Sequence, residues 1–75
     1  MLTKIDIYVI KKVKEIRTLK GFSQAELAHK IGVSSGYIGK VESLKYNSKY
    51  NLKLINKISK AFEISPRELL PKKYL

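Results

Sequence analysis

Apolar side chains recur at intervals of three and four residues along most of this chain, which is the period of an α-helix. In residues 4–20 the apolar positions that keep this spacing include Val9, Ile10, Val13, Ile16 and Leu19. In residues 52–62 they are Leu54, Ile55, Ile58, Ala61 and Phe62. Lysines occupy most of the other side of the first segment, as in a helix with one face in a core. No pair of segments alternates as neighbouring strands do, and the pattern therefore predicts an all-α fold.

Residues typical of helix ends divide this pattern into separate helices. Thr3, with a carboxylate three residues later, is placed to cap the first helix, and Gly21 is placed to stop it. Asn51 is placed to cap a later helix. A serine cap, a proline and a glutamate in residues 65–68 begin a short last helix, which Pro71 soon ends. The sequence thus predicts a compact five-helix bundle, with helices over about 4–20, 24–31, 35–43 and 52–62 and a short one from 66.

The middle of the chain combines two helix starts and one helix stop at close spacing. Ser23 and Glu26 have the spacing of a capping box, in which each side chain accepts from the other residue's backbone N–H. Gly32 suits the left-handed residue that commonly ends a helix, and Ser34 can cap the next one. Two short helices joined by so tight a turn cross steeply, and the small Ala28 permits their close approach. This arrangement is a helix-turn-helix, whose second helix would enter a DNA major groove.

The chain is strongly basic, because 16 Lys and Arg against 6 Asp and Glu give a net charge of +10. A field of this size on a small body indicates a polyanionic partner. By itself the charge is also compatible with a role in solubility or with attraction to anionic lipid. Together with the helix-turn-helix it favours nucleic acid. An amphipathic peptide on a membrane surface would need a sustained exposed apolar face, whereas here the apolar residues are expected in a core.

The length of 75 residues predicts one helix-turn-helix domain, residues 1–75, with the motif over about 24–43 and a loose tail over about 71–75. No segment approaches the roughly 20 apolar residues that span a bilayer. The N-terminus lacks the layout of a signal peptide, and the absence of cysteine fits a reducing compartment. We therefore expect a cytoplasmic protein without a membrane partner.

Residues that would support catalysis or metal binding are lacking. His29 is the only histidine, and no cysteine is present to join it at ligand spacing. The carboxylates are few and scattered, and no serine has the surroundings of an activated nucleophile. We expect neither an enzyme nor a bound cofactor or metal.

The joint pattern resembles the helix-turn-helix domains of phage repressors, the XRE family, over about residues 10–70. The residues that match the family's motif are Gln24, Ala28, Gly32, Ile38 and Val41. The segments VKEIR (13–17) and ISKAFEISPRELL (58–70) also resemble family segments. The resemblance implies a five-helix bundle of the lambda-repressor-like DNA-binding type.

By this resemblance, the positions that contact DNA bases are Ser35, Gly36, Gly39 and Lys40. Many relatives carry Gln, Asn or Arg there, whose side chains form bidentate hydrogen bonds with purines. The two glycines offer no such group, and each lowers helix stability by about 1 kcal/mol relative to alanine. They allow a close approach of the backbone or space for a thymine methyl. Ser35 is promiscuous and Lys40 addresses either guanine or a phosphate, so DNA shape is expected to contribute to specificity.

The resemblance also implies a phosphate contact by Gln24 at the start of the second helix, where free N–H groups and partial positive charge favour an anion. Tyr37 has two alternatives, which are a contact with the sugar-phosphate backbone or packing against the second helix. The loop after the third helix mixes cations, phenols and amides that suit phosphate contacts. The further phosphate-binding candidates are Lys20, Lys45, Tyr46, Asn47 and Lys49.

Arg17 and Glu42 are a structural pair implied by the resemblance, linking the first helix to the end of the third. A partly buried bidentate pair would hold the third helix on the bundle. The alternative is two independent, solvated charges.

The sequence therefore predicts a sequence-specific double-stranded DNA-binding protein that regulates transcription, with repression by promoter occupancy as the favoured mode. One domain recognises about one half-site, so a homodimer on a near-palindromic site is the geometric expectation. Family resemblance places the dimer interface near the last helix and the tail. The alternative from another class is the antitoxin of a toxin–antitoxin pair, which would bind a toxin protein and control its own promoter.

Overall fold

The computed structural model describes all 75 residues and contains helices and loops without any strand. Its α-helices are α1 (Lys4–Leu19), α2 (Gln24–Ile31), α3 (Ser35–Ser43) and α4 (Leu52–Phe62). A single turn of 3-10 helix, η1 (Pro66–Leu69), follows them. The all-α prediction is confirmed, and the α-helices begin and end within a residue of their predicted bounds.

The predicted count of five α-helices is wrong, because the last segment forms only η1. Its start follows the prediction: the N–H of Ser65 donates to the Glu68 carboxylate at 3.0 Å, and Pro66 occupies the first helical position. The segment does not continue because Leu70 precedes Pro71, and a residue before proline is driven out of the α region. Leu70 is accordingly extended, with φ −109° and ψ 153°.

Each α-helix starts at a side-chain cap that the sequence predicts. The capping residues are Thr3, Ser23, Ser34 and Asn51. In the first two, a carboxylate three residues later accepts from the cap's own N–H. The N–H and hydroxyl of Thr3 lower the pKa of Asp6, and Ser23 lowers the pKa of Glu26 in the same way. These caps satisfy N–H groups that have no partner within the helix.

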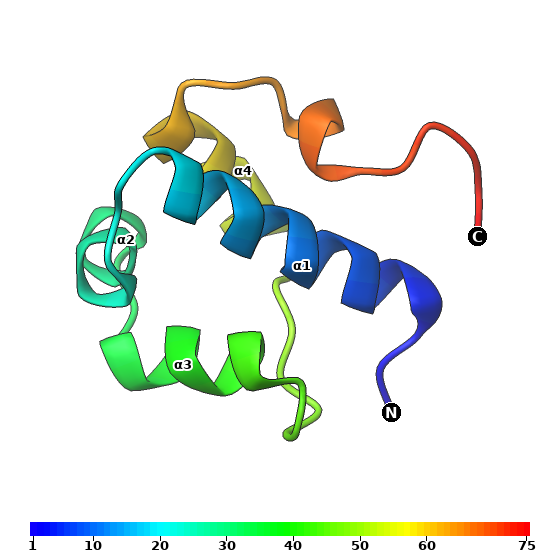
Figure 1. Cartoon of the computed structure of the whole chain (residues 1–75), viewed down its shortest axis with the longest axis horizontal. Helices are drawn as coiled ribbons and strands as arrows, with labels where there is room; N and C mark the ends of the chain where they lie inside the picture. Colours follow the sequence, from blue (N-terminus) through cyan, green and yellow to red (C-terminus); the bar gives the residue numbers. More distant parts are fainter.

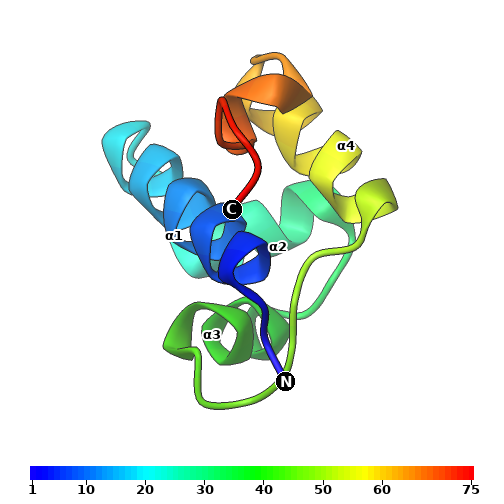
Figure 2. The same ribbon diagram turned by 90° about the vertical axis from the view of Figure 1, so that its right-hand side faces the viewer.

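Helices α3 and α4 lie on opposite sides of the molecule, with α1 and α2 between them (Figures 1 and 2). Helix α2 is central to the packing, since it contacts both α3 and α4. The buried side chains form one core, which contains Val9, Ile10, Val13, Leu27, Ala28, Ile31, Ile38, Val41, Tyr50, Ile55, Ile58, Phe62 and Leu69. This shared core holds the two helices of the motif at a constant angle.

One apolar position of α1 lies outside this core. Leu19 continues the apolar spacing of the helix, but it is 80% exposed. Each step of three residues falls short of a full helical turn by about 60°, so the steps from Val13 through Ile16 rotate Leu19 away from the buried side. It lies on the outer surface beside Lys14 and Thr18.

Three α-helices end at a residue in the left-handed conformation, which are Gly32 after α2, Leu44 after α3 and Glu63 after α4. Gly32 ends α2 with φ 75°, as predicted. Glu63 ends α4 with φ 57°, although it has a Cβ, and its side chain is exposed. An L-residue is disfavoured in this conformation, and its carboxylate also lies at the negative end of the helix dipole. Position 63 therefore carries an avoidable local strain.

Replacing Glu63 by glycine is expected to raise the free energy of unfolding by up to about 1 kcal/mol, because glycine removes the Cβ penalty but makes the unfolded chain more flexible. Glu63→Gln is the matched control, since it removes the charge and keeps the side chain. Urea unfolding of both variants measures the difference. If Glu63→Gly is no more stable than the parent, backbone strain at position 63 is contradicted. If Glu63→Gly and Glu63→Gln gain equally in free energy of unfolding, the effect comes from the charge.

Candidate nucleic-acid interface

Helix α3 has one buried and one exposed side, and the predicted base-contacting residues belong to the exposed one. On the inner side Ile38 and Val41 are fully buried. The predicted base-contacting residues are, in order, Ser35, Gly36, Gly39 and Lys40. Ser35, Gly36 and Lys40 are exposed, and Gly39 is half-buried. Helix α3 and the loop that follows it run along one side of the molecule (Figure 1), so the outer side of α3 is open to a partner.

The two glycines of α3 have different surroundings. A Cβ on Gly36 would have no neighbour nearer than 4.0 Å, the distance to Ser34 Oγ. A Cβ on Gly39 would lie 3.4 Å from the amide oxygen of Gln24, which is an ordinary van der Waals contact. Neither glycine has a positive φ. Nothing within the folded chain therefore requires glycine at position 36.

Lys40 links α3 to the following loop. Its Nζ lies 5.5 Å from the centroid of the Tyr46 ring, an arrangement in which the ring face attracts the cation. Both side chains are exposed, as are Lys45 and Asn47 beside them in the loop. The structure thus brings a predicted base-contacting residue together with predicted phosphate ligands.

Two further predicted phosphate ligands differ in their surroundings. Lys49 is exposed, but its Nζ lies 3.5 Å from a carboxylate oxygen of Asp6 in α1. Lys20 is exposed at the C-terminal cap of α1 and forms no ion pair. The charge of Lys49 is therefore partly neutralised within the protein, whereas that of Lys20 is not.

Tyr37 contacts the loop after α3, a partner that neither of its predicted alternatives names. Its hydroxyl donates to the backbone carbonyl of Lys49, and its ring meets the Tyr50 ring edge-on with 6.2 Å between centroids. The side chain is half-buried, and burial raises the pKa of the phenol. The proton that a phosphate contact would need is held by the loop. In the free chain Tyr37 thus supports the loop, and its place among the phosphate ligands stays a prediction.

Tyr50 belongs to this region but is missed by reasoning from the sequence. It is buried, and its hydroxyl has no hydrogen-bond partner. Burial, followed by the charge of nearby Glu42, raises the pKa of this phenol well above its usual value. In the sequence Tyr50 is indistinguishable from Tyr46, because both lie in one polar loop. Only the fold separates a buried tyrosine from an exposed one.

Glu42 joins three parts of the molecule. Its Oε2 accepts from Arg17 Nε at 2.8 Å, and its Oε1 accepts from Arg17 Nη2 at 3.0 Å. The same Oε1 accepts from Gln24 Nε2 at 3.0 Å. Arg17 Nη1 also donates to the carbonyl of Phe22 at 2.6 Å. The Arg17 and Glu42 side chains are 12% and 3% exposed, so the pair expected from the sequence is a largely buried, bidentate link between α1 and α3.

Gln24 begins α2 and remains exposed while bonding to Glu42. A primary amide has two hydrogens, and Glu42 takes one of them, so the other stays available. The first turn of α2 also presents backbone N–H groups that have no partner within the helix. The contact between Gln24 and Glu42 is not predicted from the sequence. It orients a donor beside the positive end of a helix.

Other kinds of site find little support among the side chains. No group of three or more His, Cys, Asp or Glu residues is arranged to hold a metal ion. His29 is exposed and lines a groove between α2 and α4. None of the helices combines the length and apolar character that crossing a membrane requires.

The family model described as Helix-turn-helix matches residues 13–69. The chain therefore belongs to the helix-turn-helix family, which confirms the resemblance drawn from its motif. The HTH-type transcriptional regulator SinR of Bacillus subtilis (strain 168) is 33% identical over 64 residues, covering 84% of this chain and 56% of SinR. This chain thus spans little more than half the length of that relative.

Two solved structures support the same fold. The restriction-modification controller protein C.AhdI from Aeromonas hydrophila is 38% identical with a TM-score of 0.73, and the match covers 85% of this chain and 94% of that one. A crystal structure of SinR, described as the master regulator for biofilm formation, was determined in complex with DNA. It is 28% identical with a TM-score of 0.70, and the match covers 81% of this chain and 95% of that one.

Arg17→Ala is expected to lower the free energy of unfolding by about 3 kcal/mol, because it leaves the buried Glu42 carboxylate without its cation. The double variant with Glu42→Ala should lose less than the two single losses added, since no unpaired charge then remains. Urea unfolding measures all three variants. Lys12→Ala removes an exposed ion pair and should change stability little. Strictly additive losses from Arg17 and Glu42 would contradict their coupling.

Gly36→Ala is expected to stabilise the free protein by up to about 1 kcal/mol through helix propensity, yet to weaken binding to a preferred duplex because the added methyl fills the space that DNA would approach. Gly39→Ala, with a similar gain in propensity and a methyl directed at Gln24, tests the second glycine of the same surface. Thermal melts and duplex binding compare the two. Unchanged affinity for Gly36→Ala would show that the duplex does not approach closely at position 36.

Proposed function

We propose that this chain binds double-stranded DNA with sequence preference and regulates transcription, acting as a repressor. The observation that carries the proposal is the open outer side of α3, whose inner side is fully buried and whose neighbours are the start of α2 and a cationic loop. The net charge of +10 supports a polyanionic partner. A relative of the same fold, SinR, has been crystallised with DNA.

In this proposal α3 enters the major groove and two side chains face base edges. Ser35 offers a hydroxyl to either a donor or an acceptor, and Lys40 offers its ammonium to guanine. Gly36 and Gly39 let the helix backbone approach closely. Because these positions supply few specific hydrogen bonds, sequence-dependent DNA shape contributes a large share of the specificity.

The phosphate contacts lie on either side of α3. Gln24 uses its second amide hydrogen on one phosphate, together with the free N–H groups of α2. The further phosphate ligands are Lys20, Lys45, Tyr46, Asn47 and Lys49. Since Lys49 also lies near Asp6, its contribution is smaller than that of Lys45. Such contacts set position and affinity rather than sequence preference.

We further propose that residues 1–75 act as one domain and bind DNA as a homodimer on a near-palindromic site. Apolar side chains near the end of the chain support this, because Leu70, Tyr74 and Leu75 remain exposed. Leu52, at the start of α4, is 83% exposed and lines a shared apolar hollow with Leu70. Covering these side chains with a second copy would remove apolar surface from water. Two α3 helices one turn of DNA apart would then occupy successive major grooves.

Repression follows from occupancy, because a dimer on a promoter excludes polymerase from the same DNA. The compartment proposed for this activity is the cytoplasm. The antitoxin alternative gains no support, since the matched relatives are named as a transcriptional regulator and a restriction-modification controller protein.

Selection of bound sequences from a random duplex pool tests this function directly. A near-palindromic preferred site is expected, with half-sites about 10 base pairs apart for a dimer. Binding to that site should fall with salt at a log–log slope of about −5 per domain, as five or six phosphate contacts predict. If the selection enriches no sequence, specific recognition is contradicted. A slope near zero would contradict DNA binding altogether.

Two single variants distinguish a phosphate contact from a base contact. Gln24→Ala is expected to weaken the preferred and a scrambled duplex by similar factors, because a phosphate contact does not discriminate. Lys40→Ala is expected to lower discrimination at one base pair by about 1–3 kcal/mol. Fluorescence titration of each variant with the preferred duplex and with duplexes changed at single base pairs or scrambled measures both effects. An even loss for Lys40→Ala would make it a phosphate ligand instead.

A further inference from the structure

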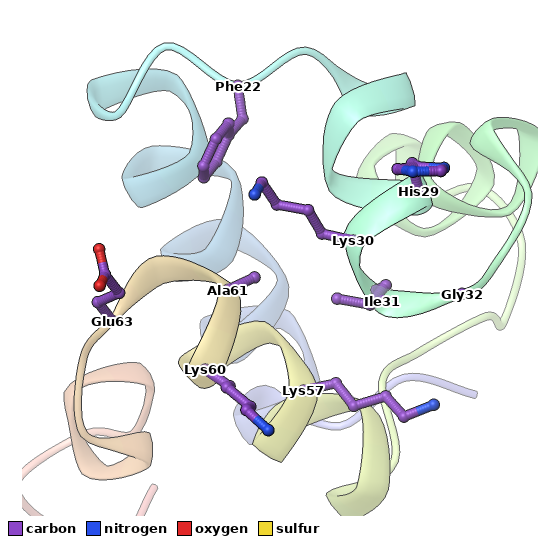
Figure 3. Close-up of a pocket in the computed structure, with 9 residues that line it drawn as sticks. All are labelled: Phe22, His29, Lys30, Ile31, Gly32, Lys57, Lys60, Ala61 and Glu63. Atoms are coloured by element: carbon purple, nitrogen blue, oxygen red, sulfur yellow. The ribbon is translucent and has the colours of Figure 1, made fainter.

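A second charged surface lies away from α3, in a groove between the later parts of α2 and α4. The groove has a volume of about 790 Å³. Figure 3 shows Lys30 extending from α2 toward Phe22, with Lys57 and Lys60 projecting from α4. His29 and Glu63 lie at its edges. We call this surface the α2–α4 groove.

Counter-charges near the lysines of the α2–α4 groove are few, because only Glu63 lines the groove and only Glu26, one turn earlier in α2, acts on Lys30. Lys30, Lys57 and Lys60 are exposed, and none forms an ion pair. Glu63 is the only carboxylate that lines the groove. Three lysines lining one groove favour a ligand that carries negative charge.

The α2–α4 groove also has an apolar part. The Phe22 ring is stacked on the buried Phe62 ring, with 5.9 Å between centroids and 14° between planes. Phe22 is only partly buried, and Lys30 Nζ lies 5.4 Å from the centroid of the Phe22 ring. A ligand for this groove would therefore combine negative charges with an apolar group that covers Phe22 and the neighbouring Ala61.

The position of the groove separates it from the proposed DNA contacts. Helix α2 contacts both α3 and α4, which lie on opposite sides of the molecule (Figures 1 and 2). No residue of α3 lines the groove. A duplex on the outer side of α3 would leave the groove uncovered.

We propose that the α2–α4 groove docks an acidic segment of a partner protein, with carboxylates on the three lysines and one aromatic or aliphatic side chain against Phe22. Charge complementarity supports a negatively charged occupant, and the partly exposed Phe22 ring favours a peptide with an apolar side chain. A nucleic-acid backbone would supply phosphates but no apolar group of this kind. Docking here is compatible with DNA on α3, so a partner can act on the DNA-bound form of the chain.

A fluorescein-labelled peptide of alternating acidic residues and phenylalanine tests the groove on the full chain by fluorescence polarisation. The groove variant is Lys30→Gln/Lys57→Gln/Lys60→Gln. The control variant is Lys4→Gln/Lys11→Gln/Lys14→Gln, which changes exposed lysines of α1 and gives the same net charge. The groove variant is expected to bind the peptide about tenfold more weakly, as three exposed charge pairs imply, and the control variant by a much smaller factor.

Two comparison peptides test the chemistry of the ligand. Replacing the acidic residues by Asn and Gln, or the phenylalanines by alanine, should each weaken binding. Equal losses in the groove and control variants, or equal binding of the neutral peptide, would overturn the proposal. So would a larger loss of duplex affinity in the groove variant than in the control, because the groove would then bind DNA. Duplex binding is measured separately, so failure of the groove leaves the proposed function standing.

Discussion

The carboxylate of Glu42 sits at the end of α3 and accepts hydrogen bonds from Arg17 in α1 and from Gln24 at the start of α2. Removing these groups from water opposes their attraction, so the network is weak evidence for net stability. Its effect is geometric. Three helices meet at one buried charge, and a shift of α3 would break bonds to both of the others. The orientation of the open side of α3 depends on this constraint.

The open side of α3 is chemically sparse. Two of its proposed DNA contacts are glycines, and Lys40 is shared with the Tyr46 ring of the loop. The loop is anchored to the body of the protein, because the Tyr37 hydroxyl donates to the Lys49 carbonyl and the Tyr50 side chain is buried in the core. The helix and the loop therefore form one surface of fixed shape. Such a surface suits recognition in which fit to the duplex matters more than many individual base contacts.

Helix α2 divides the molecule into two working surfaces. Its start contributes Gln24 to the proposed DNA surface, and its later part contributes Lys30 to the α2–α4 groove. Its inner residues Leu27 and Ile31 are almost completely buried between them. A small domain with a net charge of +10 can thus present positive charge in two directions while keeping one apolar core.

The sequence by itself determined the helices, because caps such as Ser23 and Asn51 act on N–H groups three residues away. It also indicated the motif and, through family resemblance, the pair of Arg17 and Glu42. The short length of η1 was missed because the start signal at Ser65 is strong while the stop before Pro71 follows closely. Only the tertiary structure decided the burial of Tyr50, the donor that Gln24 gives to Glu42 and the existence of the α2–α4 groove. Each of these depends on residues distant in the chain meeting across a core, and no local pattern encodes that meeting.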